Sequence, residues 1–590
     1  MRHSFWSFKG IAGTICAVAA AAIVFAGYQA HQKARYITLF DGPYQICPRE
    51  TPHYYPSLDY NFSEYGEEEA EPWGQKEGRI EGATPATTPS KAESAQALQL
   101  RLPTVYRDRR PYRSLQILCP EDGAYYPPNL CEPFIKWEDP ANNFWLIEIE
   151  FGEKPEKLSF LCREKQWRFP SALWKSLRND AVDRDARLQI KGIRIGADGK
   201  RTETIQASKT VRFRIAQEPA DNFIVYRVVV PPFSSKKTPD IRIRDIRTDR
   251  EECLLSAHRQ YCINCHTFSD KQGNRGKLGL QIRSLSGANQ SGKTPDLRMY
   301  LAIFDMDEKL GFKAQLPFVV QMSTFMAWSP GGDKLAYSAN QKLATLSPVT
   351  FETQHASTVT SDIAIYDLSQ SVTYLLPEAS DPDWLENYPC WSPDGRKFVF
   401  ARAPTGQHPA TLRYDLFAIR EEEGEHKASP IAGASNNGHS NYFPRFSPNG
   451  KWMSFCQCDG GDLIRSSSDI YILDGELNGP PRRLEFNTEN SADSWHSWSS
   501  NSRWLVFVSK RRDGAFASLY LSRIGDEGRA SPAIPLPIEN EPLASYNIPE
   551  FIANAPAAQE NELYGAIRVE QPPRVIREID GRSAAPIVHP

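Results

Sequence analysis

The sequence lacks a large net charge of either sign, a second Cys-x-x-Cys pair and any Gly-x-Ser-x-Gly segment. Of its 590 residues, 69 are Lys or Arg and 72 are Asp or Glu, so the net charge is −3. A chain with this balance has no general attraction for nucleic acid or acidic lipid. A zinc site built from two Cys pairs is not indicated, and neither is a serine hydrolase with a nucleophile elbow.

Only one long apolar run is present, near the start of the chain. Residues 11–28 read IAGTICAVAAAAIVFAGY without a charge, and Arg2, His3 and Lys9 precede them. A membrane-spanning helix needs about 20 such residues. We expect an inner-membrane anchor within residues 1–30 and periplasmic domains after it. A cleaved signal peptide is the alternative, because small residues follow the run.

Eleven cysteines suit an oxidising compartment outside the cytoplasm. Cys16 lies in the apolar run, and Cys262 and Cys265 form the one Cys-x-x-Cys pair. The remaining eight allow up to four disulfides, whose pairing the sequence does not give. Buried thiols are the alternative for each of them.

The composition changes along the chain. Residues 31–99 include an acidic stretch rich in Ala, Thr and Pro, which predicts a linker without a core of its own. Residues 100–235 contain short alternating segments such as FWLIEIEF (144–151) and FIVYRVVV (223–230), separated by turn residues. Such spacing predicts an immunoglobulin-like β-sandwich and a mainly β protein.

An internal repeat follows. Each copy has an aromatic residue, a Ser, usually a Pro, a polar turn and then an alternating strand. The copies are AWSPGGDKLAYSAN (327–340), CWSPDGRKFVFARA (390–403), RFSPNGKWMSFCQC (445–458) and SWSSNSRWLVFVSK (497–510). Repeats of about 50 residues with several strands each predict the blades of a β-propeller.

These repeats resemble those of TolB-like β-propellers. More narrowly, IVYRVVVPPF (224–233), YCINCHTFS (261–269) and SYNIPEF (545–551) resemble bacterial exported proteins that join a sandwich, one CxxCH and such a propeller. The resemblance implies five or six blades over residues 296–555, with the segment after 545 as a candidate for closing the ring and residues 556–590 as a tail. Family members carry a FHxRG-like segment after the CxxCH, whereas this chain has LGLQIRS (278–284), with Gln281 in place of the His.

The CxxCH motif, within residues 236–295, predicts one covalent haem c. Two thiols three positions apart add to the two porphyrin vinyl groups, and the adjoining imidazole binds the iron. Cys262 and Cys265 are thus the expected thioether anchors and His266 the axial ligand. A disulfide or another metal is the alternative.

The sequence does not decide whether the second axial ligand is a thioether, an imidazole or no protein group at all. A thioether raises the reduction potential, an imidazole lowers it, and a vacancy admits small ligands. The candidates are His258, Met299, Met306, Met322 and Met326.

Three polar residues lie just before or at the start of a repeated strand. His439, Asp493 and His496 are candidates to face the central channel of the propeller, where a ligand or partner binds. A hydrogen-bonding role within a turn is the alternative for each.

Three functions remain. The first is a membrane-anchored, extracytoplasmic haem protein for electron transfer or docking of a redox partner. The second is a TolB-like scaffold that binds an envelope peptide or protein and carries a structural or sensory haem. The third is a haem enzyme acting on a small ligand, which the sequence favours less than a non-enzymatic role.

Overall fold

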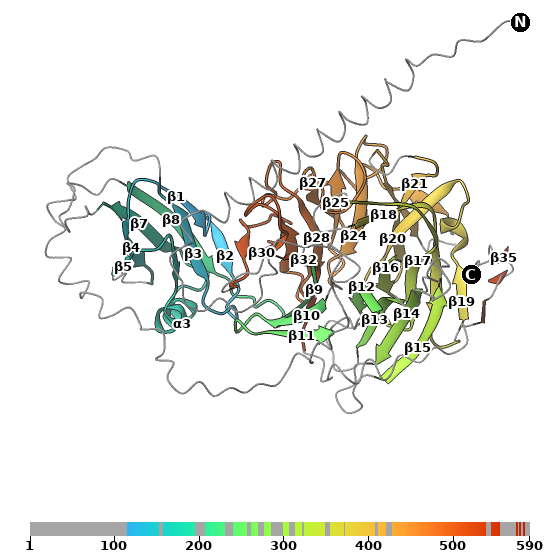
Figure 1. Ribbon diagram of the computed structural model, residues 1–590, viewed down its shortest axis with the longest axis horizontal. Coiled ribbons are helices and arrows are strands. Elements are labelled where there is room, and N and C mark those ends of the chain that lie inside the picture. The colour runs from blue at the N-terminus through green and yellow to red at the C-terminus, as the bar shows by residue number, and fades with distance from the viewer. Residues whose placement is uncertain are drawn as a thin grey trace, which may run out of the picture. The chain divides into compact units, whose positions relative to one another are not determined.

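A computed structural model describes most of the chain after residue 114. The described ranges are 115–152, 157–194, 207–229, 240–255, 261–269, 276–284, 299–305, 313–320, 324–348, 354–370, 372–407, 411–420, 427–538, 544–554, 574–575, 578–579 and 582–583 (Figure 1). They all belong to one compact unit, Pro89–Pro590. The predicted anchor and linker lie outside these ranges. Within them, no helix has the length and apolar character needed to cross a bilayer.

The protein is mainly β, as expected, and its first part contains two sheets. A five-stranded sheet has the order β2-β8-β7-β4-β5, and a three-stranded sheet has the order β1-β3-β6. The strands are β1 (Gln116–Cys119), β2 (Ala124–Tyr126), β3 (Phe134–Glu138), β4 (Phe144–Glu150), β5 (Leu158–Cys162), β6 (Gln166–Arg168), β7 (Ala186–Ile193) and β8 (Ala207–Ile215).

Aromatic side chains form the core of this part. Trp137 of β3 and Trp145 of β4 pack edge to face at 5.7 Å, which joins the two sheets. Helix α3 (Ser171–Asp180) buries Leu173, Trp174 and Leu177, which are spaced to lie on one helical face. Trp174 contacts Tyr126 at 5.4 Å, and its indole N–H donates to the Leu130 carbonyl at 2.8 Å. The helix is thereby fixed to the sandwich.

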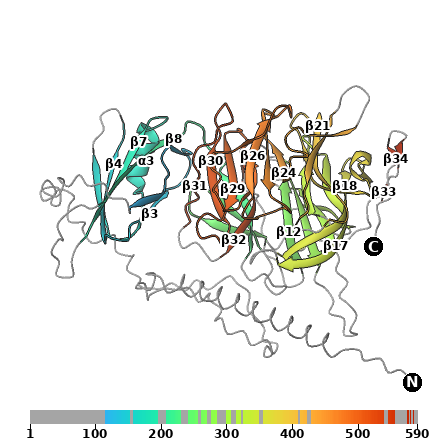
Figure 2. The ribbon, with the colours of Figure 1, turned by 90° about the horizontal axis from the view of Figure 1, so that it is seen from above.

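Four four-stranded antiparallel sheets and one nine-stranded sheet make up most of the rest (Figure 2). The nine-stranded sheet is described below as a third and a fourth sheet, because one bridge alone joins β18 to β20. The first strands of the resulting six sheets contact one another in a closed cycle, β12-β16-β20-β24-β28-β32 and back to β12. The third and fourth sheets are also linked by a single parallel bridge, Ser361 to Leu385. Each sheet is given from its first strand. The first sheet has β32 (Ser545–Ile552), β9 (Phe223–Val229), β10 (Asp240–Asp245) and β11 (Glu251–Leu255), the second has β12 (Tyr261–Phe268), β13 (Lys277–Ser284), β14 (Met299–Asp305) and β15 (Lys313–Val320), and the third has β16 (Thr324–Trp328), β17 (Lys334–Pro348), β18 (Gln354–Asp367) and β19 (Val372–Leu375). The fourth sheet has β20 (Trp384–Trp391), β21 (Lys397–Pro404), β22 (Asp415–Arg420) and β23 (Ala428–Pro430), the fifth has β24 (Ser440–Phe446), β25 (Trp452–Cys458), β26 (Asp469–Asp474) and β27 (Arg482–Arg483), and the sixth has β28 (Asp493–Trp498), β29 (Trp504–Ser509), β30 (Ser518–Arg523) and β31 (Ile534–Pro535).

Short elements add to this framework. The 3-10 turn η3 (Pro377–Ala379) precedes β20, and β33 (Arg574–Val575) pairs in parallel with β19. The remaining hairpin is β34 (Glu578–Ile579) with β35 (Arg582–Ser583).

The ring closes by joining distant parts of the chain. β32 pairs antiparallel with β9, so one sheet combines residues 223–255 with residues 545–552. The expected sandwich boundary at 235 therefore differs from the structure, which assigns β9 to the ring. The expected separate segment 236–295 differs in the same way, since it supplies β10 to β13. Propeller-like rings commonly need such a seam because no covalent bond holds the last sheet to the first.

The repeated Ser has a defined structural role. The hydroxyl of Ser329 accepts the N–H of Lys334 at 3.0 Å, and that of Ser392 accepts the N–H of Lys397 at 2.9 Å. Ser447 and Ser499 do the same for Trp452 and Trp504, at 3.0 Å each. The side chain thus closes the tight turn between the first and second strands, which explains its recurrence at this spacing.

Candidate functional site

The CxxCH motif lies inside β12, the first strand of the second sheet. Cys262 pairs with Arg283 of β13, Ile263 with Ile282, and His266 with Leu280. The register shifts between Ile263 and His266, which marks a bulge at that point. The motif is therefore part of the ring's wall.

The strand also carries a copy of the repeat that its sequence conceals. Ser269 donates its N–H to the Lys277 carbonyl at 2.9 Å, and its hydroxyl accepts the Lys277 N–H at 2.7 Å. These bonds match those of Ser329, Ser392, Ser447 and Ser499. CHTFS (265–269) consequently aligns with WHSWS (495–499), with a His and a Ser in common.

Residues four positions before the repeated Ser gather at the ring's axis. Phe325 and Tyr388 lie 4.1 Å apart between ring centroids, and Phe443 lies 6.4 Å and 6.2 Å from them. We call these three rings the axial cluster. Trp495 of β28 and Ile548 of β32 belong to the large core that also includes Tyr388 and Phe443. All five residues have positive φ, so the bulges are held in strained backbone by the packing around them. Cys265 packs against the same large core.

His266 and Cys265 face opposite sides of the second sheet. Ile263 and Phe268 pack with Val225 of the neighbouring first sheet, and the His266 ring contacts Phe268 at 6.2 Å. Cys265 instead packs against the cluster that holds Met326 and Trp328 of the third sheet. The separation follows from the packing of the two side chains, since a bulge lies between Ile263 and His266 and interrupts the regular alternation of the strand.

The His266 imidazole is buried and neutral. Only 3% of the side chain is exposed. Burial lowers the pKa of His266 to about 4, a hydrogen bond with the Val225 backbone opposes that shift, and the charge of Arg227 adds to it.

Polar residues of the first sheet lie near β12. Arg227 of β9 pairs with Asn547 of β32, and Val225 pairs with Glu550. Glu550 accepts the N–H of Phe268 at 3.3 Å, which places its carboxylate at β12. Asn547 is fully buried, and neither amide atom has a hydrogen-bond partner among the described residues.

These residues fit a c-type haem only in part. A buried, neutral imidazole suits an iron ligand. Covalent haem also requires Cys262 and Cys265 to reach one porphyrin while the adjoining imidazole lies beneath its iron. Cys265 is turned to the other face of β12, so the strand as it stands does not fit the group.

The candidates for the second axial ligand are scattered. Met326 of β16 is 4% exposed and lies across the second sheet from His266. Met299 begins β14, and its side chain is not described. His258, Met306 and Met322 lie outside the described residues.

Gln281, the residue at the position of the family's His, lies on the side of the sheet that Cys265 faces. Its neighbours Leu280 and Ile282 pack on the opposite side, toward the first sheet. Gln281 is 1% exposed, and its Nε2 has no hydrogen-bond partner among the described residues.

The three residues considered for the channel have different surroundings. His439 is exposed, and its Nδ1 lies 3.7 Å from Asp459. Asp493 accepts hydrogen bonds from Arg511 at 2.8 Å and from the Thr488 N–H at 2.6 Å; burial raises its pKa and Arg511 opposes that shift. His496 is buried with its Nδ1 3.7 Å from the Cys456 sulfur and its ring against Phe443.

Several of the other cysteines are buried thiols. Burial raises the pKa of Cys119, Cys456 and Cys458 to about 12 and that of Cys131 to about 11. None of these four forms a disulfide. They stay protonated at neutral pH, which makes them poor nucleophiles and poor metal ligands.

The sequence also contains a phosphate-loop pattern. Residues 287–294 read GANQSGKT, which matches GxxxxGK[ST]. They lie outside the described residues, between β13 and β14, which pair antiparallel as neighbours. A phosphate loop joins a strand to a helix, so the context does not support nucleotide binding.

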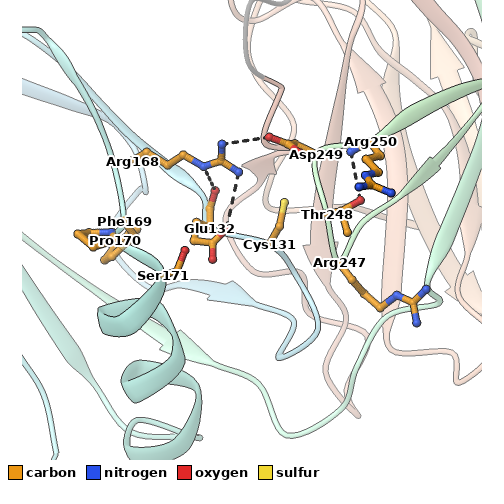
Figure 3. Close-up of a pocket in the computed structure, with 10 residues that line it drawn as sticks. All are labelled: Cys131, Glu132, Arg168, Phe169, Pro170, Ser171, Arg247, Thr248, Asp249 and Arg250. Atoms are coloured by element: carbon orange, nitrogen blue, oxygen red, sulfur yellow. Dashed lines mark hydrogen bonds and ion pairs between the residues drawn. The ribbon is translucent and has the colours of Figure 1, made fainter. Parts of the chain in front are cut away.

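A cavity of about 530 Å³ lies between the sandwich and the β10–β11 turn (Figure 3). Arg168 bridges it by contacting Asp249 at 3.2 Å and the Glu132 carbonyl at 3.2 Å. No sequence pattern predicts this cavity, because its walls come from three separate segments, residues 131–132, 168–171 and 247–250.

No known protein family matches the sequence, and no curated protein does. Solved structures similar to the chain include TolB from Acinetobacter baumannii, with 14% identity, 62% of this chain and 79% of that chain covered, and a TM-score of 0.36. A putative TolB from Agrobacterium tumefaciens has 16% identity, 47% and 95% coverage and a TM-score of 0.24. An oligogalacturonate lyase in complex with manganese has 13% identity, 58% and 86% coverage and a TM-score of 0.31. These likenesses are loose, so the description of the ring rests on the strand pairing of this chain.

Proposed function

We propose that the protein is an exported, membrane-anchored c-type haem protein whose ring is a six-bladed β-propeller of TolB-like type. Cys262 and Cys265 anchor one haem, and His266 binds its iron. The sandwich and the propeller dock a redox partner in the cell envelope. Haem c supplies one-electron transfer when bound.

The observation that carries this proposal is the His266 imidazole in its CxxCH context. The side chain is only 3% exposed, and burial keeps the imidazole in the neutral form that binds iron. Arg227 and Glu550 then provide a charged environment beside the ligand.

The test is the absorbance spectrum and intact mass of the full chain exported together with a haem-attachment system. The proposal expects covalent haem bands, a mass gain of one haem, and loss of both in Cys262→Ala/Cys265→Ala. Cys253→Ala is the matched control, since Cys253 is an exposed cysteine on β11 outside the motif. A colourless protein with the mass of the bare polypeptide contradicts the proposal. Added CO or cyanide then reports whether the second axial position is open.

A second candidate is a peptide- or protein-binding scaffold. The axial cluster favours it, because partly exposed Phe325 lies against the buried rings of Tyr388 and Phe443, which gathers aromatic side chains at one place. Tyr388 donates to Asp462 at 2.5 Å, which adds a polar group beside that surface. Selection of displayed peptides on the whole ectodomain, repeated with Phe443→Ala, tests this. Peptides that bind both proteins equally argue against a site at the axis.

A further inference from the structure

We infer that the cavity between the sandwich and the β10–β11 turn binds a small organic anion through a phosphate or carboxylate group. The cavity has a volume of about 530 Å³, and its walls come from residues 131–132, 168–171 and 247–250 (Figure 3). Sites for small molecules in proteins commonly have volumes of about 300–1,000 Å³. None of these residues belongs to the CxxCH motif, so the site does not depend on haem.

Two of the guanidiniums in the walls are already paired with carboxylates of the protein. Arg168 lies 3.2 Å from Asp249 and 3.7 Å from Glu132. Arg247 lies 2.8 Å from Asp245, the last residue of β10. These pairs hold the sandwich and the turn on either side of the cavity, and they leave the charge of Arg168 and Arg247 largely neutralised.

Two further guanidiniums have no carboxylate partner among the described residues. Arg250 lines the cavity and is exposed, so a ligand can reach it. Arg244 of β10 is only 1% exposed, its Nη2 donates to the Pro537 carbonyl, and its Nε has no hydrogen-bond partner in the described part of the chain. A buried charge without a counter-charge is costly in a protein interior. An anion bound nearby offsets part of that cost.

The charge of Arg244 acts on two residues that line the cavity. A hydrogen bond from Arg168 lowers the pKa of Asp249, and the charge of Arg244 adds to that shift. Burial raises the pKa of the Cys131 thiol to about 11, and the charges of Arg244 and Arg168 oppose it. The positive charge behind the wall is therefore close enough to attract an anion in the cavity.

Helix α3 begins at the same cavity. Its first residue, Ser171, is part of the wall, Pro170 precedes it, and no side chain caps the first N–H groups of the helix. The first turn contains no acidic residue. Helix N-termini favour anions, because their N–H groups and the helix dipole both act there. The cavity thus has donors for an anion from the sandwich and, through Arg250, from the ring.

The experiment is a calorimetric titration of the full chain with inorganic phosphate and, separately, with citrate at fixed ionic strength. Phosphate tests for a phosphate-bearing ligand and citrate for a carboxylate-bearing one. Arg250→Gln removes a guanidinium without breaking an ion pair between described residues. Ser171→Asp places a carboxylate at the start of α3, where it competes with the ligand. Arg396→Gln, at an exposed arginine in the turn between β20 and β21, is the matched control.

Saturable binding of at least one anion is expected, about tenfold weaker in Arg250→Gln, lost in Ser171→Asp and unchanged in Arg396→Gln. Ser171→Asp should keep or raise the midpoint of thermal unfolding, because an acidic residue in the first turn stabilises a helix. Lost binding in that variant is then not a sign of unfolding. Tighter binding of phosphate or of citrate assigns the ligand to one of the two classes.

Two results overturn the inference. One is binding of equal strength by all three variants, which would place the anion elsewhere on the protein. The other is the absence of saturable binding of both anions up to about 10 mM, a concentration that detects even weak ligands.

Discussion

Cys265 of β12 occupies the position that Trp495 occupies in β28, four residues before the Ser that closes the first turn. Trp495 belongs to the same large core against which Cys265 packs, and a His follows each of them. The second sheet therefore contributes a small thiol where four other inner strands contribute an aromatic ring. The structure favours an aromatic residue at this position, and Cys265 departs from that preference.

Cys265→Phe should stabilise the haem-free ring. The aromatic side chain restores the residue type of Phe325, Tyr388 and Phe443, and substitutions toward a repeat's consensus commonly add about 0.5–2 kcal/mol. Thermal unfolding of haem-free protein measures the effect. Cys265→Ser, which places a polar group at the same site, should lower the midpoint. A lower midpoint for Cys265→Phe would show that the axis has no room for a sixth large side chain.

Ser500→Pro should destabilise the protein although it restores the repeat's usual Ser-Pro pair. The N–H of Ser500 donates to Asp221 at 2.8 Å and its hydroxyl donates to the same carboxylate at 2.5 Å. Proline removes both donors and leaves a buried carboxylate short of partners, which costs about 1–3 kcal/mol. Urea unfolding measures the loss.

Pro448→Ser is the matched control for that substitution. It makes the reverse change at the equivalent position in the turn that follows β24. Among the described residues, no carboxylate corresponds there to Asp221. Its cost should be no more than about 1 kcal/mol, from the added freedom of the unfolded chain. Equal losses for both variants would contradict a special role for Asp221.

Much of the architecture could be predicted from the sequence. The alternating strands and the recurring Ser at 329, 392, 447 and 499 indicated repeated sheets, because turn chemistry and strand patterning are local properties. The aromatic residue, the turn and the second strand all lie within about 14 residues of each other in every copy.

Long-range features could not be predicted in the same way. The pairing of β32 with β9 joins residues more than 300 positions apart, and no local pattern specifies it. The copy of the repeat at CHTFS (265–269) is hard to find in the sequence, because Cys265 stands where the other copies have an aromatic residue. The alignment of His266 and Ser269 with His496 and Ser499 was the available signal.

Glu386→Gln should remove part of the pH dependence of stability. Glu386 of β20 is fully buried, neither carboxylate oxygen accepts a hydrogen bond, and Arg402 lies 3.1 Å away. Burial raises the pKa of Glu386 to about 8, against the opposing charge of Arg402. The folded protein thus keeps a proton that the unfolded chain releases near pH 4.5, so stability falls as pH rises between those values.

The measurement is urea unfolding of both proteins at intervals from pH 5 to pH 8. The wild type should lose on the order of a few kcal/mol across this range from this group, and Glu386→Gln should lose less. Identical slopes would mean that Arg402 keeps the carboxylate ionised in the folded protein.

A chain that ends at residue 543 should fail to close its ring, and a peptide of residues 544–554 should restore it. β32 supplies the inner strand of the first sheet, where Tyr546 contacts Tyr226 at 5.3 Å and Ile552 joins the core around Val225. Losing the strand exposes β9 and one edge of β12, so the truncated protein should unfold at lower temperature and less cooperatively. Added peptide should reverse both changes in a saturable way. A peptide with Tyr546→Ala and Phe551→Ala, which lacks two buried rings of β32, should bind at least tenfold more weakly. If the truncated chain unfolds like the full chain, the seam between β32 and β9 does not hold the ring closed.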